Sequence, residues 1–171
     1  MSNNQETVGK LFEYAIELEK AVETLYRQLG KMFALDHNVE QFWAHFADEE
    51  RGHASYLERI RNGVDTERLS EPADEGIIQA VHMCLSTASP KRLNSIQNFE
   101  DAYQLAIELE NSETNSIFEF MIVNFSTDEL AKSRKFLRVQ LSNHLVGLKT
   151  GLPSQYGSSI ARRNLIAMRQ H

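Results

Sequence analysis

The sequence predicts an all-α fold, and three observations lead to this prediction. Apolar residues recur with the 3.6-residue period of a helix over long stretches of the chain. Only three prolines, Pro72, Pro90 and Pro153, interrupt the 171 residues, which leaves long segments free to be helical. The pentapeptide Ala-Ile-Glu-Leu-Glu occurs at 15–19 and again at 106–110, which indicates two related helical units.

Two long helices are expected in the first third of the chain. Helical periodicity runs from about 7 to 34 and again from about 39 to 62. Asp36 or Asn38, in the break between them, can cap the second helix by accepting hydrogen bonds from its first amides. Because the break is short, the two helices should lie antiparallel as neighbours.

A second pair of helices is expected at about 99–125 and 128–149, ended by Gly151. The stretch between the two pairs, 64–97, has turn-forming residues at both ends. We interpret it as a long crossover that contains one short helix at about 76–85. Two helical hairpins joined by one crossover make a four-helix bundle.

Composition bounds the class of protein. The length favours one domain, which we place at 1–150, followed at 151–171 by a short C-terminal helix or tail. The net charge of −6 argues against a nucleic-acid partner. The single cysteine, Cys84, excludes an intramolecular disulfide and a four-cysteine metal site, and it fits a reducing compartment. We find neither a membrane span nor a signal peptide, and expect a cytoplasmic protein without a membrane partner.

One short motif points to metal chemistry. Glu50 and His53 stand three residues apart within an expected helix, so both side chains lie on one face. A carboxylate and an imidazole on one face form half of a site for iron, manganese or zinc. Taken alone the motif is weak, because such pairs more often belong to a solvated face.

The internal repeat brings this motif a partner. The 91-residue offset of the pentapeptide places His53 on His144. It places Glu50 on Leu141, so the second half of the duplicated site lacks a carboxylate. We infer two hairpins related by pseudo-twofold symmetry, with one half-site better preserved than the other.

The repeat also pairs Glu19 with Glu110. Glu19 lies on the same helical stripe as Ala15, Val22 and Tyr26, where an ionised carboxylate is costly unless it is paired or bound to metal. The two glutamates could instead stand at the border of the stripe. We favour the interpretation that they are ligands.

At this point the sequence resembles the rubrerythrin-type branch of the ferritin-like di-iron carboxylate family, over all four expected helices. The residues that carry the resemblance are Glu19 followed by Tyr26, the Glu50–His53 motif, the Glu-x-x-Glu pair of Glu110 and Glu113, and His144. It implies a ferritin-like up-down four-helix bundle, with Tyr26 as a hydrogen-bond donor to a ligand. The metal ligands that it implies are Glu19, Glu50, His53, Glu110, Glu113 and His144.

Two departures from the family pattern bear on activity. The glutamate that normally bridges both metals is Leu141, and the single cysteine excludes the family's rubredoxin-like iron domain. We therefore expect a degenerate site for one or two iron ions, with manganese or zinc as alternatives.

The implied function is oxidative, either peroxide reduction or ferrous-iron oxidation, with an external electron donor such as a rubredoxin. The catalytic residues remain unidentified. The alternative is a non-enzymatic dimeric bundle, a metal-storage or interaction module with a relic site. A homodimer is expected, and any exposed apolar surface around Phe42, Trp43 and Phe46, together with the C-terminal tail, would suit its contact.

Overall fold

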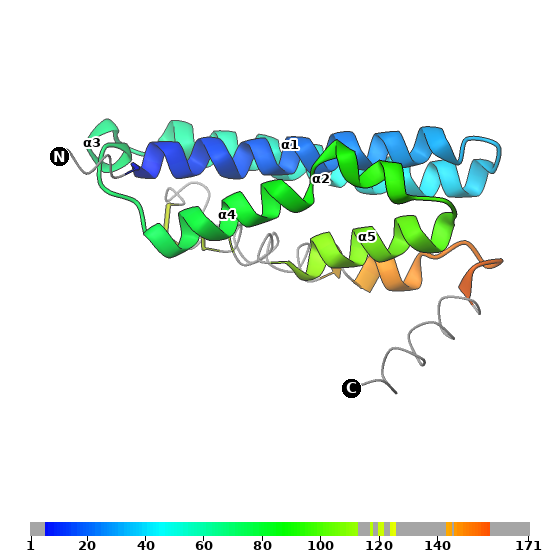
Figure 1. Ribbon diagram of the computed structural model, residues 1–171. Helices are drawn as coiled ribbons and strands as arrows, with labels where there is room; N and C mark the ends of the chain where they lie inside the picture. Colours follow the sequence, from blue (N-terminus) through cyan, green and yellow to red (C-terminus); the bar gives the residue numbers. More distant parts are fainter. Residues whose placement is uncertain are drawn as a thin grey trace.

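The structure is a computed structural model, and it describes residues 6–112, 117, 120–121, 124–125, 143–144 and 146–157. In this part of the chain every regular element is a helix (Figure 1). The β-type contact found there is one isolated bridge between Thr7 and Pro72. The prediction of an all-α class is therefore confirmed.

Helices α1 (Val8–Met32) and α2 (His37–Gly63) form an antiparallel pair joined by a short turn (Figure 1). Thr7 caps α1 by accepting a hydrogen bond from a backbone amide at 3.2 Å. Asp36 caps α2 by accepting from two amides at 3.0 and 3.3 Å, so the cap is Asp36 rather than Asn38. Both cap residues have an extended backbone, which lets each side chain accept hydrogen bonds from amides two or three residues further along the chain.

The crossover is more helical than expected. It contains α3 (Thr66–Leu69), α4 (Glu75–Thr87) and a short 3₁₀ helix, η1 (Pro90–Ser95). The proline of η1 stands in its first turn, where its missing N–H costs nothing, so it starts a helical turn instead of ending structure. Helix α4 packs against α1, and Ile78 and Val81 are among its buried residues.

Helix α5 (Phe99–Asn111) begins as predicted, with Asn98 as its cap. The prediction of one continuous helix over 99–125 is wrong, because Ser112 has an extended backbone with ψ of 173°. The Ser112 hydroxyl bonds to the carbonyl of Leu109, a local alternative to the helical ladder. The described residues beyond this break, up to Phe125, are again helical.

The fourth predicted helix, 128–149, lies largely outside the described residues. Its described positions near the end are helical, and Gly151 follows the last helical residue as expected. The segment 146–157 lies beside α5 (Figure 1), where the rings of Phe99 and Tyr156 stack with centroids 4.3 Å apart. The division into a bundle at 1–150 and a tail stays a prediction.

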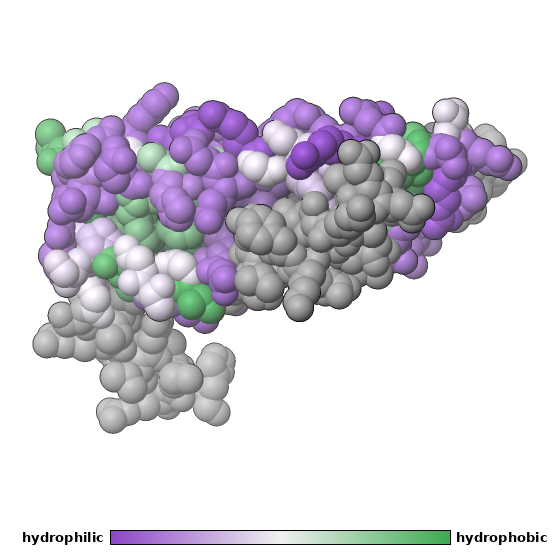
Figure 2. Space-filling view, turned by 180° about the vertical axis from the view of Figure 1, so that it is seen from behind, coloured by the Kyte–Doolittle hydropathy of each residue, from purple (hydrophilic) through white to green (hydrophobic). Residues whose placement is uncertain are grey.

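The core lies between α1, α2, α4 and α5. Phe42, Trp43 and Phe46 belong to it, at 8%, 0% and 2% exposure, so these three side chains are not available for the expected dimer contact. The described residues on the face shown in Figure 2 are mostly hydrophilic, with small hydrophobic patches. Among the described residues no helix is both long and apolar enough to span a bilayer.

Replacing Asp36 by alanine should lower the free energy of unfolding by about 1 kcal/mol, because α2 loses its N-cap. Asp65 offers a matched control, since it stands at the N-cap of α3 without a capping hydrogen bond. Denaturant unfolding of both variants would check this. Equal stability of Asp36→Ala and Asp65→Ala would contradict the assignment of the cap.

Candidate metal centre

Five ionisable side chains gather in the core, near the middle of α1 and α2 and at the C-terminal end of α5. Glu19, Glu50, Glu110 and His144 are at most 5% exposed, and the side chain of His53 is 12% exposed. They come from four segments: α1, α2, α5 and the helical residues before Gly151. Burying an ionisable group costs free energy unless the group is paired or bound, so five such groups together require a stabilising interaction.

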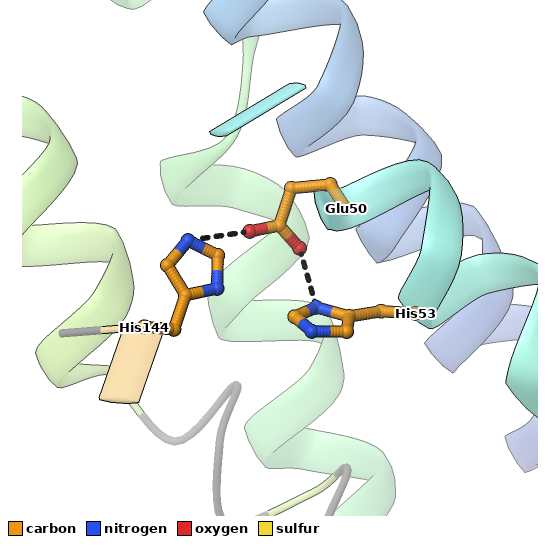
Figure 3. Close-up of side chains that lie close together, drawn as sticks. All are labelled: Glu50, His53 and His144. Atoms are coloured by element: carbon orange, nitrogen blue, oxygen red, sulfur yellow. Dashed lines mark hydrogen bonds and ion pairs between the residues drawn. The ribbon is translucent and has the colours of Figure 1, made fainter. Parts of the chain in front are cut away.

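Glu50 stands between the two histidines (Figure 3). Its Oε2 lies 3.0 Å from Nδ1 of His53, three residues further along α2. Its Oε1 lies 3.3 Å from Nε2 of His144. The carboxylate thus presents one oxygen to each imidazole, which are 5.4 Å apart between ring centroids. The i, i+3 geometry predicted for the motif is confirmed.

A second carboxylate approaches each histidine. On one side, Oε2 of Glu19 lies 3.4 Å from Nδ1 of His53. On the other side, Oε1 of Glu110 lies 3.6 Å from Nε2 of His144. Tyr26, fully buried, donates a hydrogen bond of 2.6 Å from its hydroxyl to the same Glu110 oxygen. The repeat-related pairs therefore meet in one cluster, and Tyr26 holds a member of it.

Two residues named by the sequence lie outside the described residues, Glu113 and Leu141. One residue that sequence reasoning missed joins the cluster: Oε2 of Glu49 lies 3.5 Å from Nε2 of His144. Glu49 precedes Glu50 and is turned about 100° from it on the helix, which favours a solvent-facing position. No pattern within α2 marks it, because its partner comes from a distant segment.

The four central groups differ in protonation. Burial, and then the charges of neighbouring carboxylates, raises the pKa of Glu50 well above its usual value. Burial likewise raises the pKa of Glu110 to about 7. Burial opposes protonation of His53, but hydrogen bonds with Glu19 and Glu50 outweigh it and raise the pKa to about 11.

His144 shows the opposite behaviour. Burial, and then the nearby positive charge of His53, lowers its pKa to about 3. Its imidazole is therefore neutral at pH 7, with a lone pair free on one ring nitrogen. The ring of Phe46 stacks on it, with centroids 5.1 Å apart, and holds its plane.

Several polar atoms of the cluster are buried without a hydrogen-bond partner among the described residues. They are both ring nitrogens of His144 and Oε2 of Glu49. Each such atom costs about 1–3 kcal/mol unless something satisfies it. A cation bound between them would do so.

The spacing of the donor atoms fits that account. Glu50, His53 and His144 can each offer one ligand atom with all three within 4.8 Å of one another. Metal–ligand bonds of about 2.0–2.2 Å put neighbouring ligand atoms roughly 2.8–3.6 Å apart in octahedral or tetrahedral geometry. The separations of 3.0–3.6 Å found around the two histidines lie close to this range.

Comparison of the chain with protein-family models, with curated proteins and with solved structures gave no match. The resemblance to the rubrerythrin-type branch therefore stays a prediction. So do the assignment of the cluster as ligands and any catalytic role. The arguments below rest on the chemistry of this chain's own residues.

Proposed function

We propose that this chain is a metal-binding helical bundle of the rubrerythrin type, with a degenerate site for one or two iron ions. Manganese and zinc are alternatives, because carboxylate and imidazole ligands suit all three. The observation that carries the proposal is the Glu50 carboxylate, which presents one oxygen to His53 and the other to His144 (Figure 3). A carboxylate in this position can bridge two ions.

The cluster divides into two positions that share Glu50. The first is formed by Glu19, Oε2 of Glu50 and His53. The second is formed by Oε1 of Glu50, Glu110 and His144. Glu113 is kept as a further ligand on the resemblance alone.

The proposal includes the ferritin-like four-helix arrangement. Its support is that residues paired by the 91-residue repeat meet at one place: Glu19 and Glu110 from α1 and α5, and the two histidines. Two hairpins around a pseudo-twofold axis would bring about this convergence. The antiparallel α1–α2 pair supplies the first hairpin.

When bound, iron would supply the redox chemistry: peroxide would be reduced with electrons from an external donor such as a rubredoxin, or ferrous iron as substrate would itself give its electrons to peroxide or dioxygen. The chain's own residues orient the ligands and shield them from solvent. Tyr26 fixes Glu110 through its hydrogen bond, as hydrogen-bonded neighbours of metal ligands generally do. Phe46 holds the plane of His144 and covers it from solvent.

A second candidate is a non-enzymatic bundle, a storage or interaction module in which the cluster is a relic. The ion pairs of His53 favour it. With a pKa of about 11 this imidazole is charged, and Glu19 and Glu50 neutralise it without any metal. The unsatisfied nitrogens of His144 favour the metal instead, because an ion pair at His53 does nothing for them.

Metal analysis of the full chain separates these candidates. After expression with added iron, manganese or zinc, we expect about one to two bound ions per chain, as in ferritin-like sites. Rapid-mixing absorbance should then show oxidation of the ferrous protein by peroxide. Less than about a tenth of an equivalent of any metal would contradict metal binding. Bound iron without a peroxide reaction would favour storage.

A further inference from the structure

Glu49 departs from the behaviour of an ordinary surface carboxylate. Its side chain is 38% exposed, yet Oε2 is buried and has no hydrogen-bond partner among the described residues. A carboxylate at the surface can expose both oxygens to water, and burying one of them without a hydrogen-bond partner costs free energy. The buried oxygen lies 3.5 Å from Nε2 of His144, a nitrogen that is also buried and unsatisfied.

Three carboxylate oxygens surround that nitrogen. Glu50 contributes one at 3.3 Å, Glu49 one at 3.5 Å and Glu110 one at 3.6 Å. None of these contacts is a hydrogen bond, so the nitrogen is close to three carboxylate oxygens without being satisfied by any of them. Distances of 3.3–3.6 Å from this nitrogen are close to those between neighbouring ligand atoms of one ion.

We propose that Glu49 is the carboxylate ligand of the second metal position, in place of the glutamate that the sequence repeat lacks at Leu141. This inference rests on the proposed metal-binding function. With Glu49 included, the described carboxylates of the cluster are Glu19, Glu49, Glu50 and Glu110. Their four negative charges equal the charge of two divalent cations.

Glu49 also connects the cluster with the surface. Its other oxygen lies 3.7 Å from Nε2 of His45. His45 and Phe46 line a surface cavity of about 550 Å³. The second position is therefore completed by a ligand from the solvent side, whereas Glu19 completes the first position from within the core.

Titration of the metal-free full chain with Co²⁺, followed by visible absorbance and calorimetry, tests this assignment. In Glu49→Gln, one binding step should weaken by about tenfold or more, and the other should keep its wild-type affinity. In Glu19→Gln, the other step should weaken. Glu40→Gln, which removes an equally charged and 44% exposed side chain from the first turn of α2, should leave both steps unchanged.

The outcomes separate this inference from the proposed function. Wild-type affinity for every bound ion in Glu49→Gln would overturn the role of Glu49, whether the wild type holds one ion or two, and would leave metal binding intact. A wild-type chain that binds no Co²⁺ would overturn both. Should Glu49→Gln not fold, Glu49→Asp is the second variant. It keeps the negative charge but places the carboxylate oxygens further from His144, because the side chain is shorter, and the same criteria apply to it.

Discussion

Replacing Glu50 by glutamine is expected to abolish tight binding at both metal positions. Its two oxygens face different histidines, so one substitution removes a ligand charge from each side of the cluster. We expect the affinity for each ion to fall by about 100-fold or more, beyond the loss typical of an outer hydrogen-bonding neighbour. Metal content after purification and the Tm with and without added metal would measure this loss.

Thermal unfolding measures the loss of metal binding in Glu50→Gln without a count of the bound ions. An ion at about 100 times its Kd stabilises a folded chain by about 2.7 kcal/mol, so the wild type should gain a metal-dependent rise in Tm that Glu50→Gln lacks. Glu58→Gln is a matched control, because Glu58 lies on the same helix and pairs at the surface with Lys20. A Glu50→Gln variant that still binds two ions tightly would refute the bridging arrangement.

Metal affinity is expected to rise steeply with pH between about 6 and 8. His53, with a pKa near 11, carries a proton that it must lose to become a ligand. Glu110, whose pKa burial raises to about 7, holds a further proton over part of this range. Because the protonated form is the metal-free form, acid favours release, and affinity should change about tenfold per pH unit for each proton displaced.

The two histidines should differ in whether they release a proton when the metal binds. His144, with a pKa of about 3, is already neutral and releases no proton. A His53→Gln variant should therefore bind more weakly, but with a pH slope smaller by about one proton. Calorimetry in buffers of different ionisation heat would count the protons directly. Affinity constant within about twofold from pH 6 to 8 would contradict the protonated state of the metal-free cluster.

Much of the helical scaffold could be predicted from local chemistry. The bounds of α1 and α2 lie within two residues of the expected ones, because apolar period and capping residues act over a few positions. The break after α5 could not be predicted in this way. Ser112 has low helix propensity, but so do many residues within helices, and only its hydroxyl bond to Leu109 shows which state it takes.

The amino-acid sequence determined which groups to bring together: the Glu50–His53 motif and its 91-residue repeat led to Glu19, Glu110 and His144, and the apolar stripe around Glu19 predicted that this side chain is buried. Only the tertiary structure decided how these groups meet. It turned one Glu50 oxygen to each histidine, set Tyr26 against Glu110, and drew in Glu49. The physical reason is the distance along the chain over which each kind of information acts. Periodicity acts within a helix, whereas the contacts of His144 depend on how segments distant in sequence pack together.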